Sequence, residues 1–229
     1  MIGIIGAMKE ETDALVALMN VEKETDVLTY HFYQGKLGQA DAVVVQGGIG
    51  KVNAAISATT LLNDFDIDHL INIGTAGGLL EQENVGDIIV GKEVVHHDFD
   101  LLGFGRPYGQ VPDLPFPFKA DEEMVRLCEE ALADINVPHH AGLIASGDQF
   151  VCRQEQVDAI MSHFPESMCC EMEAASIAQV ATVFGVPFII TRGLSDIFGK
   201  GDNGIQFDDY IHQAAASSAK MCYELAQKL

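Results

Sequence analysis

Short apolar runs recur along the chain, and helix-like segments separate them. Strands are predicted from these runs over residues 1–8, 40–48, 69–79, 86–95, 140–148 and 186–196. The last run, VPFIITRGLSD, is almost continuously apolar, as a strand covered on both faces is. This alternation of strands and helices predicts an α/β fold, in which helices pack on the faces of one sheet.

The segments between the strands have helical or loop character. Helices are predicted over 9–19, 48–65, 119–135 and 207–229 and, from its buried-helix composition, over the run CCEMEAASIAQVA at 169–181. Residues 96–119, rich in aromatic residues, Gly and Pro, predict a long ordered loop of the kind that is often functional. The chain shows no linker, repeat or low-complexity segment. We expect residues 1–229 to form one domain, a three-layer α/β/α sandwich around a central mixed, mostly parallel twisted sheet.

The charge of the chain excludes two classes of partner. Its 13 basic and 34 acidic residues give a net charge of −21. Such a surface repels nucleic acid and anionic membranes, so neither is expected as a main partner. A highly phosphorylated substrate is also disfavoured, although a local basic pocket could override the average charge.

The cysteines indicate a reducing compartment. There are five of them, an odd number, and none forms a C-x-x-C pair. We therefore expect a cytoplasmic protein with neither a zinc site nor a disulfide framework. The start MIGIIGAMKEE has no basic region, so it is not expected to be a signal peptide, and no apolar run approaches the length of a membrane span.

Several predicted strands end in glycines or in a Ser/Asp pair, and these ends are the candidate site. Ligands of open α/β sheets lie beyond the carboxyl ends of the strands. The segment GGIGKV is not a P-loop, because Val45 stands where the first Gly is needed and Val52 replaces the Ser or Thr. The segment GIIGAM does not match the dinucleotide fingerprint either. The glycines could allow a ligand to approach the backbone closely, or serve helix packing alone.

Charged residues stand at or near these strand ends. Glu10 and Glu11 follow the first strand, and Asp196 ends the last one; each could be catalytic or could simply serve a helix end or a turn. Arg192 lies inside an apolar run, where a cation needs an anion as partner.

A second pair of acids, Glu171 and Glu173, opens the predicted helix at 169–181. Buried carboxylates are costly unless they are paired or hydrogen-bonded. Residues two apart on a helix point in nearly opposite directions, so at most one of the two would face a given pocket. The other is expected to pair with a cation or to cap backbone N–H groups.

Seven short blocks occur in a fixed order from Gly3 to Asp196. They are GIIGAMKEE, GGIGKVNAA, IGTAGGL, VGDIIV, SGDQFV, EMEAASIA and RGLSD. In this combination the chain resembles the bacterial 5′-methylthioadenosine/S-adenosylhomocysteine nucleosidases of the nucleoside phosphorylase superfamily. The resemblance implies a nucleoside phosphorylase-like fold and a hydrolase of methionine salvage. It would cleave the N-ribosidic bond of both nucleosides, and of 5′-deoxyadenosine, to release adenine without a metal or cofactor.

The resemblance also implies catalytic roles. Glu11 matches the family's base that activates the attacking water, and Asp196 matches the acid that protonates N7 of adenine. Thr75 and Arg192 match the neighbours of the water. The family often has Ser at the first of these positions, and the added methyl group of Thr75 could shift the water slightly.

Further positions match the family's substrate contacts. Glu173 would bind the ribose hydroxyls, Met172 would pack on the sugar, Phe150 would stack on the base and Val151 would offer it backbone hydrogen bonds. The remaining matched positions are Met8, Ile49 and Phe207, near the sugar and the 5′ substituent, and Ser195 beside the acid. The loop 96–119 would reach the partner subunit of a homodimer and there provide Leu101, Phe104 and Pro112.

Other functions stay open at this stage. Phosphorolysis on the same fold would need cations for phosphate, and the acids Glu10 and Glu11 argue against it, although Lys9, Lys51 and Arg192 could still supply them. A hydrolase of 6-amino-6-deoxyfutalosine would have nearly the same sequence. A nucleoside-binding regulatory protein is the non-enzyme alternative, and the presence of both Glu11 and Asp196 argues against it.

Overall fold

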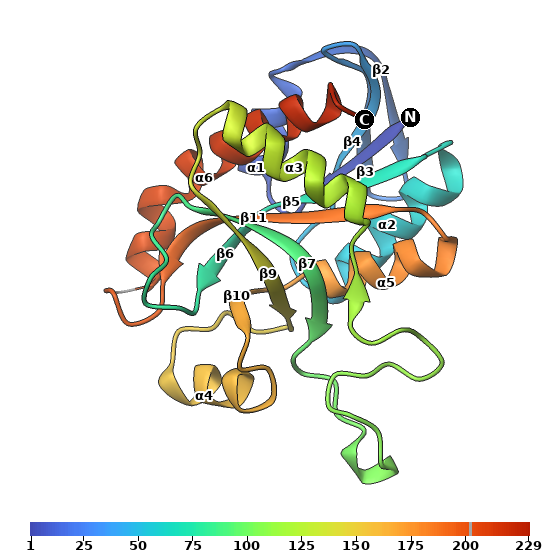
Figure 1. Cartoon of the computed structure of the whole chain (residues 1–229). Coiled ribbons are helices and arrows are strands. Elements are labelled where there is room, and N and C mark those ends of the chain that lie inside the picture. The colour runs from blue at the N-terminus through green and yellow to red at the C-terminus, as the bar shows by residue number, and fades with distance from the viewer. Residues whose placement is uncertain (202) are drawn as a thin grey trace.

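The computed structural model describes residues 1–201 and 203–229. Figure 1 shows a twisted sheet with helices around it. The strands are β1 (Ile2–Gly6), β2 (Met19–Val27), β3 (Tyr30–Leu37), β4 (Ala40–Gln46), β5 (His69–Ile73), β6 (Thr75–Gly78), β7 (Ile88–His96), β8 (Phe118–Lys119), β9 (His139–Ser146), β10 (Ser167–Glu171) and β11 (Phe188–Ile197). The helices are α1 (Lys9–Val16), α2 (Lys51–Asp64), α3 (Glu122–Asp134), α4 (Gln154–His163), α5 (Ala174–Phe184) and α6 (Asn203–Ala226), with a 3₁₀ turn at Leu102–Phe104.

The described strands form one mixed sheet in the order β2-β3-β4-β1-β5-β11-β6-β10-β9-β7-β8. Its central pairs, from β4 through β1, β5 and β11 to β6, are parallel, and the hairpin β2–β3 is antiparallel at one edge. Strand β11 also pairs with β7, so the sheet curls back on itself there. The predicted α/β fold with a mixed central sheet is confirmed.

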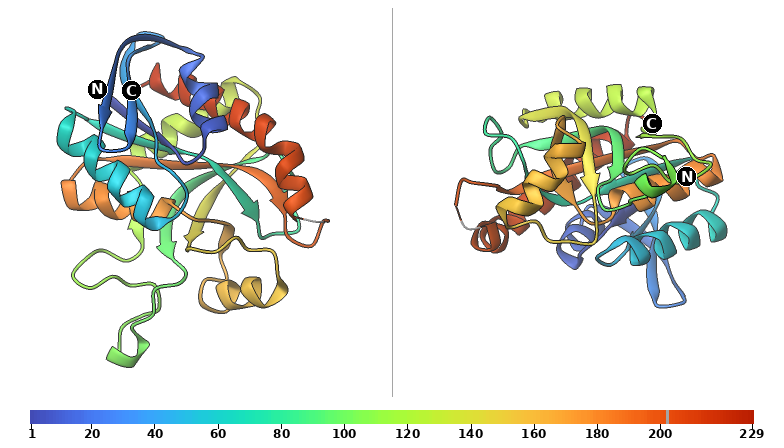
Figure 2. Two further views of the ribbon diagram at one scale, coloured as in Figure 1. Left: turned by 180° about the vertical axis from the view of Figure 1, so that it is seen from behind. Right: turned by 90° about the horizontal axis from the view of Figure 1, so that it is seen from below.

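Helices cover both faces of this sheet. Helices α1 and α3 pack against α6, and α2 packs against α5. Figures 1 and 2 show these two groups on opposite sides of the strands. Every residue of β1 and of β11 is buried, which explains why β1 and the first half of β11 read as apolar runs in the sequence. None of the described helices has the length and hydropathy needed to cross a membrane.

Four elements differ from the sequence-based expectation. The hairpin β2–β3 was not predicted, because its first strand is largely polar and exposed, and α4 was not predicted either. The run expected as one strand over 69–79 is two strands with Gly74 between them, where a Cβ would lie 3.1 Å from the Cζ of Arg192. The expected helix over 169–181 is wrong at its start, since the first three of these residues belong to β10.

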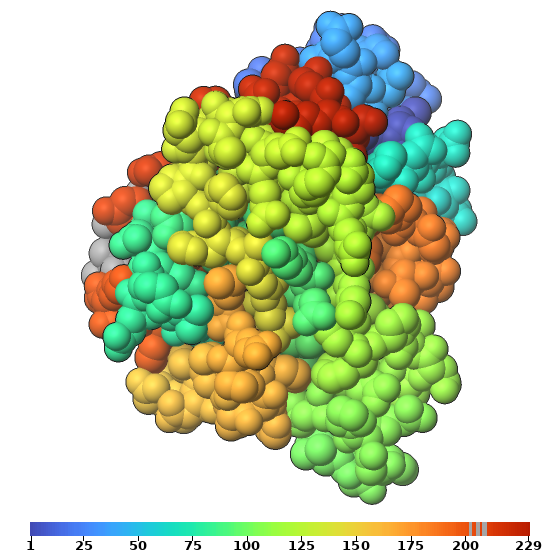
Figure 3. Space-filling view, in the orientation of Figure 1, coloured from blue at the N-terminus to red at the C-terminus, as the bar shows by residue number. Residues whose placement is uncertain are grey.

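The predicted long loop lies between β7 and β8 and carries the 3₁₀ turn. Its base is anchored on α4, because the ring of Tyr108 stacks on that of His163 with centroids 3.8 Å apart. Its tip extends away from the body of the molecule, as the light-green lobe of Figure 3 shows. Phe104 at this tip is 82% exposed. An apolar side chain in that position is suited to contact another surface.

Candidate active site

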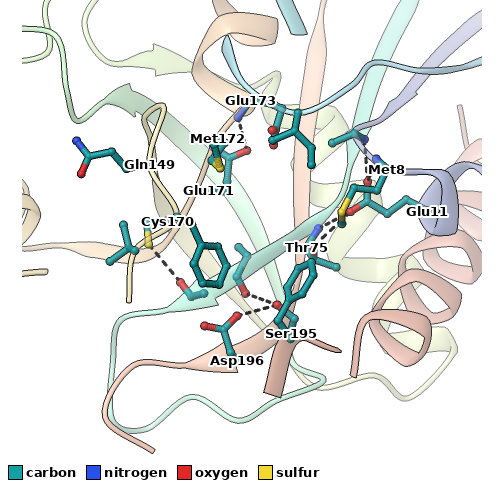
Figure 4. A pocket seen from close by; sticks show the side chains of 17 residues that line it. Met8, Glu11, Thr75, Gln149, Cys170, Glu171, Met172, Glu173, Ser195 and Asp196 are labelled. Atoms are coloured by element: carbon teal, nitrogen blue, oxygen red, sulfur yellow. Dashed lines mark hydrogen bonds between the residues drawn. The ribbon is translucent and has the colours of Figure 1, made fainter. Parts of the chain in front are cut away.

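One cavity lies where β1, β6, β10 and β11 end and where α1 and α5 begin (Figure 4). Its empty space, open mouth included, is about 620 Å³. It is lined by Ala7, Met8, Glu11, Ile49, Thr75, Ala76, Gly77, Gln149, Phe150, Val151, Cys170, Glu171, Met172, Glu173, Ser195, Asp196 and Phe207. Apart from Arg192, every site residue expected from this chain itself is in that lining. The structure therefore brings these residues together in one cavity near the strand ends.

Glu11 is held in a fixed orientation at the start of α1. Its Oε2 accepts hydrogen bonds from the amides of Ala7 (2.7 Å) and Met8 (3.0 Å). Its Oε1 accepts bonds from the amide (3.0 Å) and the hydroxyl (3.3 Å) of Thr75. Burial raises the pKa of this carboxyl, while the amides and the charge of Arg192 counteract the rise. Glu11 is thus an ionisable, preorganised base whose basicity exceeds that of an exposed glutamate.

Asp196, at the end of β11, has both carboxyl oxygens engaged. Oδ1 accepts a hydrogen bond from the hydroxyl of Ser195 (2.8 Å), and Oδ2 accepts one from the side-chain amide of Asn203 (2.6 Å). Gly77 lets the carboxyl lie against the backbone of β6, where a Cβ would be 3.1 Å from Oδ2. Burial raises the pKa of Asp196, and the two donors partly offset the effect. A raised pKa is what a carboxyl needs to act as a proton donor near neutral pH.

Arg192 lies behind the cavity wall. The prediction that it would line the site beside the water position is not met. Its guanidinium is fully buried and donates to Glu171 Oε2 (2.5 and 3.1 Å) and to Asn72 Oδ1 (2.7 Å). A buried guanidinium needs such partners, and the carboxylate of Glu171 satisfies it more completely than the cavity could. Arg192 still acts electrostatically on Glu11, whose pKa it lowers.

The expectation that at most one of Glu171 and Glu173 would face the pocket is wrong, because the two acids do not share a helix and both line the cavity. Glu171 ends β10, and Glu173 is the residue before α5. Glu171 Oε2 accepts hydrogen bonds from the amides of Glu173 (3.0 Å) and Ala174 (2.9 Å) in addition to its pairing with Arg192. The expectation that one acid of this pair would pair and cap a helix is confirmed for Glu171.

Glu173 is the second acid, and its carboxylate has a free oxygen. Its Oε1 accepts a hydrogen bond from the amide of Gly50 at the start of α2 (2.8 Å), and no described residue donates a hydrogen bond to Oε2. Burial and the nearby charge of Glu171 raise the pKa of Glu173. A buried carboxylate with spare acceptor capacity is suited to bind hydroxyl groups of a ligand.

The remaining walls of the cavity are apolar. The rings of Phe150 and Phe207 meet edge to face with centroids 6.0 Å apart, and Phe150 is half-exposed. Met8, Met172 and Ile49 complete the apolar lining. A flat, uncharged ligand can pack against such rings. The residues expected from a partner subunit, Leu101, Phe104 and Pro112, do not line this cavity; they lie in the loop between β7 and β8.

Sequence reasoning missed some residues of the site. Gln149 and Cys170 line the cavity, and Asn203 and Asn72 hold Asp196 and Arg192 from outside it. Gln149 lies within the block SGDQFV and Cys170 directly precedes the block EMEAASIA, so both could have been found from their neighbours. Asn203 carries no such signal, because it lies in a Gly-rich stretch with no pattern.

No lysine, arginine or histidine is among the described residues that line the cavity. The three cations that sequence analysis left open for phosphate are each paired with a carboxylate elsewhere. Lys9 pairs with Asp13, Lys51 with Asp98 (2.5 Å) and Arg192 with Glu171. The described part of the chain also contains no group of three or more His, Cys, Asp or Glu side chains placed to hold a metal ion. The cavity is therefore acidic, which favours a neutral ligand.

Comparison with known proteins agrees with this geometry. The family model of the phosphorylase superfamily matches residues 1–227. A 5′-methylthioadenosine/S-adenosylhomocysteine nucleosidase from a Geobacillus species is 46% identical, with 100% of this chain and 98% of the relative aligned. The crystal structure of the Neisseria meningitidis nucleosidase in complex with methylthio-immucillin-A is 39% identical and superposes with a TM-score of 0.95, covering 100% of this chain and 99% of that one.

A third relative, the Colwellia psychrerythraea nucleosidase in complex with adenine, is 37% identical and has a TM-score of 0.96, with 100% of this chain and 95% of that one covered. The similar sequence and both solved structures thus match this chain over essentially its full length. The chain belongs to the phosphorylase superfamily and, within it, to the family of 5′-methylthioadenosine/S-adenosylhomocysteine nucleosidases.

Proposed function

We propose that this protein hydrolyses the N-ribosidic bond of 5′-methylthioadenosine and S-adenosylhomocysteine, and also of 5′-deoxyadenosine, to release adenine in methionine salvage. The observation that carries the proposal is the pair Glu11 and Asp196. These two carboxyls come from different strand ends and enter one cavity that has apolar walls and no cation in its described lining. Two carboxyls with opposite proton-transfer tasks are the usual means of cleaving glycosidic bonds.

Asp196 is the acid in this proposal. Cleavage of the bond leaves adenine with an electron pair, and protonation at N7 makes the base a neutral leaving group. The burial that raises the pKa of Asp196 keeps a proton available for this step. Ser195 holds the carboxyl in orientation through its hydroxyl.

Glu11 is the base. It takes a proton from the water that attacks the anomeric carbon, with Thr75 as the neighbouring hydroxyl. As the bond breaks, positive charge develops on the sugar, and the carboxylate of Glu11 stabilises it electrostatically. Arg192 acts through Glu171 and through its charge, since it does not line the cavity.

Glu173 is proposed to bind the ribose hydroxyls, and Glu173→Gln tests this role. The variant is expected to raise KM for 5′-methylthioadenosine about 10- to 100-fold, because the amide has a single acceptor oxygen and its NH₂ group would face either the Gly50 amide or the ribose hydroxyls. It should also reduce the preference for ribosyl over 2′-deoxyribosyl substrates. Steady-state kinetics on both substrates measures this, and an unchanged preference would remove Glu173 from the ribose contact.

Asn203 is expected to set the pH range of the reaction. Its amide stabilises the ionised form of Asp196 and so lowers the pKa of that carboxyl. The reaction needs Asp196 protonated, so kcat/KM falls as pH rises through this pKa. Loss of the amide in Asn203→Ala raises the pKa and should move the alkaline limb of the kcat/KM profile to higher pH.

The variant Asn203→Asp is a second, stronger test of the same effect. It places a second negative charge beside Asp196 and should move the limb further in the same direction. A limb that stays in place in both variants would show that Asn203 does not control the protonation of Asp196.

Phosphorolysis is the closest alternative. It requires a phosphate anion beside the anomeric carbon, where this chain has Glu11. Lys9, Lys51 and Arg192 are all engaged with carboxylates, so none is available to neutralise phosphate without giving up its partner. Hydrolysis is the reaction that this distribution of charge favours.

The protein is proposed to act as a cytoplasmic homodimer. The free cysteines fit a reducing compartment. The exposed apolar loop tip, with Leu102 52% and Phe104 82% exposed, fits burial against a second copy of the chain. In that assembly Leu101, Phe104 and Pro112 would complete the 5′-substituent pocket of the partner.

Adenine release is the experiment that tests the proposed function. The protein is incubated separately with 5′-methylthioadenosine, S-adenosylhomocysteine, 5′-deoxyadenosine and 6-amino-6-deoxyfutalosine, and free adenine is measured by chromatography. Release from the first three supports the proposal. Release from aminofutalosine alone would identify the related hydrolase, and binding of adenine without turnover of any substrate would identify a nucleoside-binding protein.

A further inference from the structure

Helix α2 begins without a capping side chain of its own. The residue before it is Gly50, whose φ of 92° lies in the left-handed region that glycine tolerates. Two carboxylates from distant parts of the chain accept its first amides instead. Glu173 Oε1 accepts from the amide of Gly50 and Asp148 Oδ1 accepts from the amide of Lys51, each at 2.8 Å.

These two carboxylates connect the start of α2 to different sides of the cavity, although only Glu173 lines it. Glu173 is the acid assigned to ribose, whereas Asp148 stands two residues before Phe150, in the turn assigned to the base. The start of α2 therefore ties the ribose side of the cavity to the base side. Because helix amides are fixed in space, the two halves cannot shift independently while both bonds are made.

An ion pair also stabilises the start of α2. Lys51 Nζ lies 2.5 Å from Asp98 Oδ1, and both side chains are only about one-fifth exposed, at 20% and 19%. The second oxygen of Asp98 accepts a hydrogen bond from the amide of Asp148 (2.9 Å). Lys51, Asp98 and Asp148 thus form a closed ring of contacts. Burial alone would raise the pKa of Asp98, but these two donors hold it below its usual value, as expected for a firmly ion-paired carboxylate.

Packing removes the remaining freedom of the turn. The ring of His97 lies directly against Gly147, where a Cβ would be 2.4 Å from the ring. The amide of His97 donates to Ser146 O (2.8 Å), and that of Gly147 donates to Glu171 O (3.0 Å). The turn before Phe150 is therefore held from both sides, and the Asp98 contact joins it to the first residues of the loop that follows β7.

We propose that Lys51, Asp98 and Asp148 are positioning residues that set the spacing between the ribose-binding acid Glu173 and the base-binding turn at Phe150. The inference rests on the proposed function. None of the three side chains lines the cavity, so each acts through Gly50 or through the turn. The acid Asp196 and the base Glu11 are held by other contacts and keep their positions when the ring is broken.

This arrangement predicts a particular kinetic signature. A shift of the base turn relative to the ribose acid weakens binding of the ground state and of the transition state alike. Such a loss raises KM and leaves kcat nearly unchanged. General loss of folded protein would instead lower kcat in proportion to the active fraction and leave KM as it is.

The test compares Lys51→Met, Asp98→Asn and the double variant with wild type. Each single variant is expected to raise KM for 5′-methylthioadenosine and the Kd for adenine about tenfold, with kcat nearly unchanged. The double variant should be no worse than either single one, because both remove the same contact. Lys51→Arg, which keeps the charge, should recover most of the affinity.

Lys36→Met is the matched control, since it breaks the exposed ion pair of Lys36 in β3 with Asp41 in β4 (2.6 Å), and neither residue lines the cavity. Its KM and adenine Kd should equal those of wild type. Unchanged adenine Kd and KM in folded Lys51→Met and Asp98→Asn, or a fall in kcat at constant KM, would overturn the positioning role.

The adenine Kd, measured by calorimetry, keeps this test separate from the proposed function. If wild type binds adenine but releases none from any nucleoside, the proposed hydrolase activity is refuted. The adenine Kd values of the variants would still test the positioning role of Lys51, Asp98 and Asp148. If Lys51→Met does not fold, Asp98→Asn, which preserves the shape of the side chain, carries the same comparison.

Discussion

Asp196→Asn is expected to lower kcat for 5′-methylthioadenosine about 10²- to 10⁴-fold, the range typical for loss of a general acid. Asparagine has the shape of aspartate but no proton to give to N7, so adenine must leave with its negative charge uncompensated. The carboxamide has one oxygen where the carboxylate has two, so the Asn203 amide can keep donating to that oxygen while the Ser195 hydroxyl turns to accept from the NH₂ group, and the surroundings of the side chain should persist. Single-turnover release of adenine, with enzyme in saturating excess over substrate, measures the effect on the chemical step.

The thermal stability of Asp196→Asn, unlike its kcat, is not expected to fall. The raised pKa of Asp196 means that its charged form is disfavoured in the folded state, so ionisation costs stability as pH rises through that pKa. The neutral asparagine should therefore be at least as stable as wild type in thermal unfolding at neutral pH. Glu83→Gln is a suitable control, because Glu83 is a buried carboxyl outside the cavity lining and its loss should leave turnover near wild type. Near-normal turnover by Asp196→Asn would remove the acid role from this residue.

Glu11→Gln is expected to lower kcat by a similar factor, about 10²- to 10⁴-fold, through loss of the base. The structure adds a second effect. Both oxygens of Glu11 accept bonds from donors, Ala7 and Met8 on one side and Thr75 on the other. The NH₂ group of glutamine would face a donor on either side, so folding stability should also fall by about 1–3 kcal/mol.

The pH profile separates the two effects of this substitution. In wild type, Glu11 must be ionised, so kcat/KM falls as pH drops through its pKa, which burial raises. The glutamine variant has no group to titrate there and should lose that acidic limb. A variant that keeps the limb, or that retains more than about a tenth of the wild-type kcat, would contradict the general-base role, for which losses of 10²-fold or more are typical.

Much of the fold could be predicted from the sequence because its central strands are buried on both faces. Strand β1 and the first half of β11 read as apolar runs for this reason. The edge hairpin β2–β3 could not be predicted in the same way. Its first strand alternates between exposed and half-buried residues and contains mostly polar side chains, so its pattern resembles that of a loop.

The residues that line the cavity were largely predictable, and the residues that lie behind it were not. Glu11 and Asp196 stand at strand ends, and the strand-end rule placed both in one cavity. Arg192 was expected in the same cavity, yet a fully buried guanidinium takes the partner that satisfies it best, and that partner is Glu171. Asn203 comes from a segment without periodicity and reaches Asp196 only through tertiary folding.

The central claim is that water, and not phosphate, is the nucleophile. Its most direct test is adenine release from 5′-methylthioadenosine in phosphate-free buffer, repeated with added phosphate, while ³¹P NMR monitors the sugar product. The account predicts equal rates in both buffers, free methylthioribose as the product and no signal from a sugar 1-phosphate. Adenine release that depends on phosphate, with a sugar 1-phosphate as product, would contradict it and would make the chain a phosphorylase.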